Sequence, residues 1–404
     1  MMLTVQQAQN RILSAVSVLE PEERHILDSL GCVLAQDVYA KENLPPFRNS
    51  SMDGFAVLTE DVQLARTDQP VQLSIAEIIP AGYVPRIALK SGQAAKIMTG
   101  AMLPKGADSV VMAEDTESNN EYVKVFQSID SLDNVRLPGE SVKIGDLVMP
   151  KGKSIRAQEV AMLAALNIQK VCVFRPPIVA VVSTGDELVD LGTKLNLGKI
   201  RDSNRYGIMA QLTEIGCQSI DLGICGDNEE QIENTLRDGL VKSDALITSG
   251  GVSVGEYDVV KSVLSRLGQI NFWRVAMKPG KPQAFGFADG KPIFGLPGNP
   301  VSSLTVFELF VRPALRKIAG ICQFKRPTFR AVLDQDVVNN AERVSYMRAL
   351  VEKREEQYHV QVTGPQGSGI LYSLVLANGL ITIPANTTVK TGELVELQFF
   401  GDAL

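Results

Sequence analysis

Between residues 177 and about 320, short apolar runs alternate with segments of helical spacing, and this alternation constrains the fold more than any other feature. The run at 178–182 is continuously apolar and β-branched, as expected of a strand buried on both faces. Helices are expected at 203–215 and at 228–240, where apolar residues recur at helical spacing. This period predicts a doubly wound, mostly parallel α/β sheet.

The rest of the 404-residue chain divides around this region, and the length favours about three domains. Residues 1–46 and 151–176 contain helical patterns, including an expected helix at 22–30, and are predicted to form one discontinuous helical domain. Residues 47–150 contain short β-like runs and form a β-rich insertion. The α/β domain is placed at 177–326, and 327–404 are predicted to form a small C-terminal β domain, a barrel or sandwich.

Composition excludes several classes of function. The net charge of −6 and the lack of a basic block argue against nucleic-acid binding. No apolar run approaches the roughly 20 residues that span a bilayer, and the first residues do not resemble a signal peptide, so a cytoplasmic protein is expected. Five scattered cysteines and two histidines argue against a Cys/His zinc site.

Three glycine- and proline-rich loops each follow an apolar run, at 249–258, 278–282 and 297–302. Open α/β sheets bind ligands at the carboxyl ends of their strands, where such loops lie. Gly250 and Gly251 allow close approach of the backbone, whose N–H groups can form an anion-binding nest. The loops therefore predict a site for an anion beside a hard metal ion.

The other two loops add charge and free donors. Lys278 and Lys281 lie on a backbone stiffened by two prolines, so they lose little entropy when they converge on a ligand. Pro300 at a helix start, with Ser302 just inside, leaves backbone N–H groups without helical partners.

Each of these motifs also has an ordinary structural interpretation. A Gly-Gly turn often only connects a strand to a helix, and Asp258 at a helix start is more commonly a cap than a metal ligand. Residues 183–187, Ser-Thr-Gly-Asp-Glu, suit a nucleotide or magnesium as well as an exposed acidic turn. Asp53 and Thr99 lie in glycine turns, where such residues usually serve the turn itself.

Taken in order along the chain, the motifs resemble those of the molybdopterin molybdenumtransferases, the MoeA family that includes the gephyrin E domain. They lie at residues 49–56, 97–101, 183–188, 249–258, 277–282, 296–302 and 367–371. The resemblance implies insertion of molybdate into adenylylated molybdopterin with release of AMP, assisted by Mg²⁺ or another divalent metal. It also implies a C-terminal β-barrel, a homodimer with its active site between subunits, and contacts with other proteins of molybdenum-cofactor biosynthesis.

The resemblance assigns roles to individual residues. Those implied near the nucleotide phosphates and the metal are Glu187, Asp227 and Asp258, and those implied to come from the partner subunit are Asp53 and Thr99. Molybdate is implied at Lys278, Lys281 and Ser302, and a second oxyanion at Arg348 and Ser373. Further substrate-binding positions are Ser249, Gly250, Gly251, Arg274, Pro297 and Pro300. Arg274 replaces a lysine common in the family, which keeps the charge but changes its geometry.

Two other functions remain open on the sequence. The chain could be a non-catalytic, gephyrin-like scaffold of the same fold, but such a protein would be expected to have lost an acidic or lysine position, and all are present. It could instead be a relative of the α/β domain that acts on another nucleotide. That relative would lack the insertion and the C-terminal β domain, whereas this chain has the sequence patterns of both.

Overall fold

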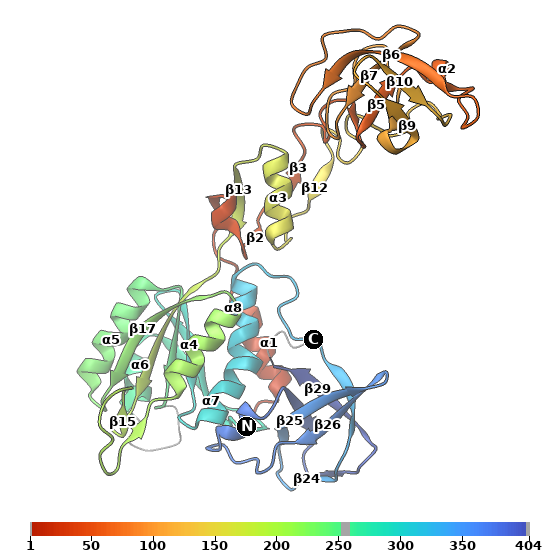
Figure 1. Ribbon diagram of the computed structural model, residues 1–404. Coiled ribbons are helices and arrows are strands. Elements are labelled where there is room, and N and C mark those ends of the chain that lie inside the picture. Colours follow the sequence, from red (N-terminus) through yellow and green to blue (C-terminus); the bar gives the residue numbers. More distant parts are fainter. Residues whose placement is uncertain (1, 252–258, 401–404) are drawn as a thin grey trace. The chain divides into compact units, whose positions relative to one another are not determined.

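The computed structural model describes residues 2–251 and 259–400 (Figure 1). Contacts divide the chain into two compact units. The first comprises Met1–Glu23, Gly31–Ala35 and Cys172–Leu404, and the second Arg24–Leu30 and Gln36–Val171. Among the described residues, no helix combines the length and the apolar character needed to cross a membrane.

The first unit is built on a six-stranded sheet in the order β17-β14-β18-β22-β21-β19. Its strands are β14 (Ile178–Thr184), β17 (Gln218–Cys225), β18 (Ala245–Ser249), β19 (Gln269–Arg274), β21 (Pro282–Ala288) and β22 (Lys291–Leu296). The four strands β17, β14, β18 and β22 are parallel, and β21 and β19 extend the sheet in antiparallel pairing. The predicted mostly parallel sheet is confirmed.

Helices cover both faces of this sheet. On one face, α4 (Asn204–Glu214) and the helical stretch beginning with α7 (Pro300–Val306) pack against Val179, Val181 and Ile247. On the other face, α5 (Glu229–Lys242) and α6 (Val259–Leu267) pack against Ala180, Val182 and Leu246. Because neighbouring strand residues point to opposite faces, the continuous apolar run of β14 serves both layers.

The N-terminal helix α1 (Val5–Ala15) begins with a capping box in which Thr4 and Gln7 bond each other's backbone N–H groups. Its buried residues Ala8 and Ile12 join the core on the α4 side of the sheet. By contrast, α3 (Ala157–Ala165) belongs to the second unit. The helical patterns at 1–46 and 151–176 are therefore divided between the two units.

A hydrogen bond joins α1 to the helical stretch that begins with α7, at a carbonyl that a proline leaves without its usual donor. The helix of α7 continues through the π-helix η3 (Phe307–Val311) into α8 (Arg312–Ile318). Pro313 has no N–H to donate to the Leu309 carbonyl four residues earlier. Gln9 of α1 supplies the missing donor, with its Nε2 atom 2.9 Å from that carbonyl oxygen.

The prediction of a helix at 22–30 is wrong. This segment forms the strand β1 (Glu22–His25) and the short 3-10 helix η1 (Ile26–Ser29). His25 is extended, and its Nδ1 accepts the Leu27 N–H at 3.3 Å, which starts the 3-10 turn. Leu27 and Leu30 are 69% and 62% exposed, so the apolar residues do not form one buried helical face.

The second unit contains a six-stranded sheet in the order β8-β5-β7-β6-β10-β9. Its strands are β5 (Gly54–Val57), β6 (Val71–Ile79), β7 (Gln93–Ile97), β8 (Ser109–Met112), β9 (Thr116–Ser118) and β10 (Tyr122–Val125). The chain enters this region along β3 (Val38–Tyr39) and leaves it along β12 (Leu147–Met149), which pairs antiparallel with β3. The predicted β-rich character of this region is confirmed.

The C-terminal region, drawn in blue in Figure 1, is a closed barrel. Five strands pair in the order β25-β26-β23-β29-β27, and β27 pairs again with β25 to close the ring. They are β23 (Phe329–Leu333), β25 (Val344–Arg354), β26 (Gln357–Val362), β27 (Gly379–Ile383) and β29 (Leu394–Phe399). The short strand β20 (Met277–Lys278) joins the edge of β25 and links this barrel to the α/β region.

Candidate functional site

The pocket of interest lies where the order of the parallel strands reverses. β14 comes first in the chain but lies between β17 and β18, so the connections leaving β14 and β17 run in opposite directions across the sheet. Ligands bind outside the carboxyl ends of the strands at such a switch point. A pocket of about 780 Å³ opens there, and its lining includes Thr184, Asp227, Ser249 and Pro297.

The glycines after β18 are required by close packing. Gly250 and Gly251 have φ angles of +96° and +64°, in the left-handed region that favours glycine. A Cβ atom on Gly250 would lie 2.6 Å from the Thr184 carbonyl oxygen, and one on Gly251 would lie 2.2 Å from Val260. The expectation of free N–H groups is wrong for Gly250, because its N–H donates to the Leu296 carbonyl at 3.0 Å.

Asn204, at the start of α4, joins two of the predicted loops. Its Nδ2 donates to Ser249 Oγ at 2.9 Å and to the Gly298 carbonyl at 2.8 Å. Asn204 lines the pocket, yet the sequence indicated only a helix start at this position. The available signal was that a polar residue beginning α4 would lie near the same sheet edge as the loops.

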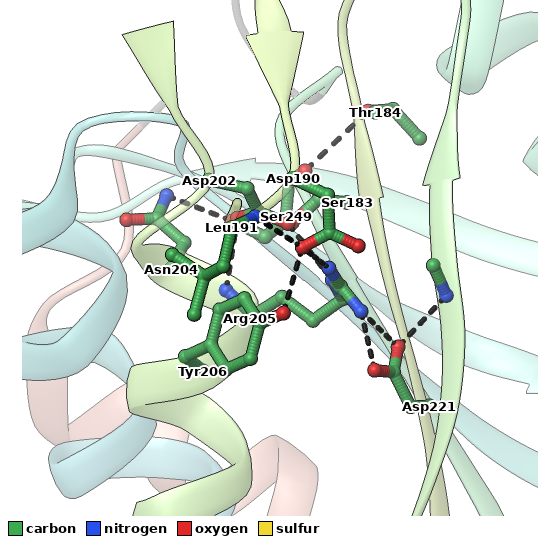
Figure 2. Close-up of polar contacts among 11 residues, drawn as sticks. Ser183, Thr184, Asp190, Leu191, Asp202, Asn204, Arg205, Tyr206, Asp221 and Ser249 are labelled. Carbon is green, nitrogen blue, oxygen red and sulfur yellow. Dashed lines mark hydrogen bonds and ion pairs between the residues drawn. The ribbon is translucent and has the colours of Figure 1, made fainter. Parts of the chain in front are cut away.

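A buried charge cluster lies next to Asn204 (Figure 2). The Arg205 side chain is 2% exposed and bonds three carboxylates from different segments, those of Asp190, Asp202 and Asp221. Burial lowers the pKa of Arg205, but the bonds and charges of Asp202 and Asp221 outweigh it, so the pKa is raised. Asp202 also accepts the Ser183 hydroxyl at 3.0 Å, which ties this cluster to the end of β14.

Two of the three predicted acidic residues belong to the lining of the pocket. Glu187 and Asp227 both line it, and the Asp186 carboxylate helps to bring their loops together by accepting the Asp227 N–H at 3.0 Å. The third acidic residue, Asp258, lies outside the described residues. Within residues 2–251 and 259–400, no cluster of three or more His, Cys, Asp or Glu side chains is arranged to hold a metal.

Pro297 in the loop before α7, and Pro300 and Ser302 in the first turn of α7, line the pocket, and their contact with a substrate stays a prediction. A loop of the barrel is bonded to this segment. The Val301 N–H donates to the Ser368 carbonyl at 3.1 Å, and the Asn299 side chain donates to the Ser368 hydroxyl at 3.1 Å. Gly369 of the barrel loop accordingly lines the same pocket.

The predicted cations lie outside the pocket lining. Lys278 is exposed on β20, where it pairs with Ser345 of the barrel, and Arg274 is exposed at the end of β19. The Lys281 carbonyl accepts the Val275 N–H, and the next residue, Pro282, lines the pocket. The lysine loop therefore ends at the pocket, one residue beyond Lys281.

Arg348 of β25 and Ser373 of the short helix α9 (Tyr372–Val375) lie together and are buried, at 1% and 2% exposure. Arg348 Nε donates to Ser373 Oγ at 3.0 Å, and its other nitrogens donate to the carbonyls of Pro365, Gln366 and Gly367. Burial lowers the pKa of Arg348 to about 10. An oxyanion at this pair stays a prediction, and it requires the loop carrying these carbonyls to open.

Asp53 and Thr99 belong to the second unit and bond each other directly. Asp53 Oδ1 accepts the Thr99 N–H at 2.7 Å and the Thr99 hydroxyl at 2.8 Å. These two bonds hold the pKa of the Asp53 carboxyl below its ordinary value. These bonds join the two turns that carry the residues, and their role in a substrate site stays a prediction.

Comparison with known proteins decides the family. Three family models match in succession: the MoeA N-terminal region (domain I and II) at 3–167, a probable molybdopterin binding domain at 180–317, and the MoeA C-terminal region (domain IV) at 330–400. A molybdopterin molybdenumtransferase of Haemophilus influenzae is 37% identical over the full length of both chains. This chain belongs to the MoeA family.

Other relatives agree along the whole chain. A MoeA relative from Nostoc sp., also named a molybdopterin molybdenumtransferase, is 36% identical and aligns with 96% of this chain and 91% of its own. The crystal structure of a molybdopterin biosynthesis MoeA protein from Pyrococcus horikosii superposes with a TM-score of 0.80 at 32% identity, covering 99% of each chain. The α/β fold and the C-terminal barrel are thus those of the MoeA family.

Proposed function

We propose that this protein is a molybdopterin molybdenumtransferase that inserts molybdate into adenylylated molybdopterin and releases AMP in the cytoplasm. The observation that carries the proposal is the switch-point pocket, which combines two carboxylates, a glycine loop and the Pro297–Pro300 segment in a chain of the MoeA family. A site for a phosphorylated substrate needs these close backbone approaches.

The donor set fits a divalent metal, Mg²⁺ in the first instance. Mg²⁺ is commonly held by one or two carboxylates together with substrate phosphates, which is what Glu187 and Asp227 offer at one pocket. Asp258 is proposed as a third carboxylate. When bound, the metal would neutralise charge that develops on the phosphoanhydride as it is cleaved.

Molybdate, a dianion, requires cationic and hydroxyl donors close to the reacting sulfurs. We propose that Lys278, Lys281 and Ser302 provide them, with Arg274 adding positive charge. The protein is proposed to act as a homodimer in which Asp53 and Thr99 of one subunit complete the site of the other. Contacts with other proteins of molybdenum-cofactor biosynthesis are proposed on the same basis.

The direct test supplies purified protein with adenylylated molybdopterin, molybdate and Mg²⁺, and measures AMP release and activation of an apo-molybdoenzyme. The wild type should do both, and Asp227→Asn should lose at least tenfold in rate. Asp238→Asn, an exposed acidic residue on α5 paired with Lys242, is the matched control and should retain activity. Substrate binding without AMP release by the wild type would instead support a scaffold.

The shared site has its own test. Asp53→Ala and Lys278→Ala should each be inactive alone. Mixed dimers of the two should regain activity, because one composite site in each mixed dimer would have all its residues. If unfolding and refolding the two variants together restores nothing, the site is not shared between subunits.

A further inference from the structure

The Asn204 side chain bonds two neighbouring loops of the pocket. The Ser249–Gly251 loop follows β18, and the loop at 297–300 follows β22. The Asn204 amide donates one hydrogen to each, to Ser249 Oγ and to the Gly298 carbonyl. The Gly298 carbonyl can only accept, so it fixes which end of the amide faces the loops.

The bridge is short, buried and at the pocket. Asn204 is 8% exposed and lines the pocket together with Ser249 and Gly298. The loops approach so closely that a Cβ atom on Gly298 would lie 3.8 Å from the Gly250 Cα atom. A second contact, from the Gly250 N–H to the Leu296 carbonyl, lies at the strand ends. Asn204 therefore adds a side-chain contact between the two loops, on the pocket side, to the backbone contact at the strand ends.

The residue type matters for this role. An aspartate has the same size but cannot donate to a carbonyl, and a glutamine is one methylene longer. Arg205, the next residue, is held by three carboxylates, and these ion pairs fix the backbone at the start of α4, from which the Asn204 side chain extends. Errors of about 1 Å in reactant placement can lower rates about 100-fold.

We propose that Asn204 is a positioning residue that holds the Ser249–Gly251 loop and the loop at 297–300 at the spacing the reaction requires. The proposal rests on the function proposed above, because it assumes that these two loops hold the phosphorylated substrate. The proposal gives Asn204 the role of holding the two loops together, and this role does not depend on what each loop binds.

The test compares Asn204→Asp with Asn339→Asp. Asn339 is also buried, at 3% exposure, and its amide likewise donates to loop carbonyls, but these lie within the barrel. Asn204→Asp should lower kcat by about 10- to 100-fold and weaken AMP binding several-fold. Asn339→Asp should lower stability without changing kcat of the folded enzyme.

A second variant, Ser249→Ala, keeps the proposal testable if Asn204→Asp does not fold. Ser249→Ala removes one end of the bridge and leaves the Asn204 bond to Gly298. It should have a smaller effect on kcat, and the two changes together should be less than additive because they share one contact. Unfolding followed by the single tryptophan, Trp273 of β19, reports whether each variant is folded.

The outcomes separate this proposal from the proposed function. If the wild type releases no AMP, the proposed function fails, and Asn204 is judged by amide hydrogen exchange at Gly298, Asn299 and Val301. Exchange there should speed up in Asn204→Asp and stay unchanged in Asn339→Asp. Equal exchange in the two variants, or a kcat of Asn204→Asp within twofold of wild type, overturns the positioning role.

Discussion

Two buried arginines in the same compact unit have opposite surroundings. Arg205, next to the pocket residue Asn204, is held by three carboxylates, whereas the nitrogens of Arg348 in the barrel donate to one hydroxyl and three carbonyl groups. Both residues are almost fully buried. Ion pairs raise the pKa of Arg205 despite its burial, and burial lowers that of Arg348 to about 10.

The difference separates two ways of holding a loop. Arg205 joins Asp190, Asp202 and Asp221, so it locks the edge of the sheet to the start of α4 through opposite charges. Arg348 holds a barrel loop through neutral groups, among them three loop carbonyls, and Ser368 of that loop bonds Asn299 before α7 and Val301 within it. The first arrangement leaves negative charge in excess, and the second leaves a buried positive charge close to a loop of the pocket.

Removing Arg205 should have the largest effect. In Arg205→Leu, the buried Asp202 would lose its ion pair and two more carboxylates would be left beside it. Removing one partner of a buried ion pair typically costs about 3–5 kcal/mol. Urea unfolding followed by Trp273 fluorescence should show a loss of this size. A loss below 1 kcal/mol would mean that the carboxylates are not held by the arginine.

Removing Arg348 should cost less, because no carboxylate is left unpaired. Arg348→Leu would leave carbonyls of the loop at 365–367 without donors. Leaving a buried polar group without its partner costs about 1–3 kcal/mol, and we expect a loss of stability in this range. Arg348→Lys should recover part of this loss, since lysine keeps the charge but cannot make the same forked contacts. A cost equal to that of Arg205→Leu would contradict the contrast between the two residues.

Much of this architecture is predictable from sequence, but neither arginine is. The apolar run of β14, the helix α5 and the glycine loop at 249–251 depend on neighbours in the chain, and local patterns indicate them. The partners of Asn204 lie 45 and 94 residues away, so only the folded chain brings them together. The helix predicted at 22–30 does not form, because the apolar residues at helical spacing there do not share one buried face.

The smallest predicted effect is a difference in pH dependence. Asp190 is half exposed, and bonds from Tyr206 and the Leu191 N–H, with the charge of Arg205, lower the pKa of its carboxyl. A carboxyl whose pKa is lower in the folded state stabilises the protein above its ordinary pKa of about 3.9, and this stabilisation is lost as the pH falls through the folded value. Asp190→Asn should therefore be less stable than wild type at pH 7 and pH 5, and the gap should shrink near pH 3.

Arg348→Leu provides the contrast, since Arg348 bonds no carboxylate within the described residues and stays protonated throughout this range. Its deficit should be the same at pH 7, 5 and 3, measured by the same tryptophan fluorescence. A gap for Asp190→Asn that stays constant down to pH 3 would mean that its carboxylate charge contributes nothing to the Arg205 cluster. A gap for Arg348→Leu that closes with falling pH would place an acidic partner beside that arginine, and the contrast between the two clusters would no longer hold.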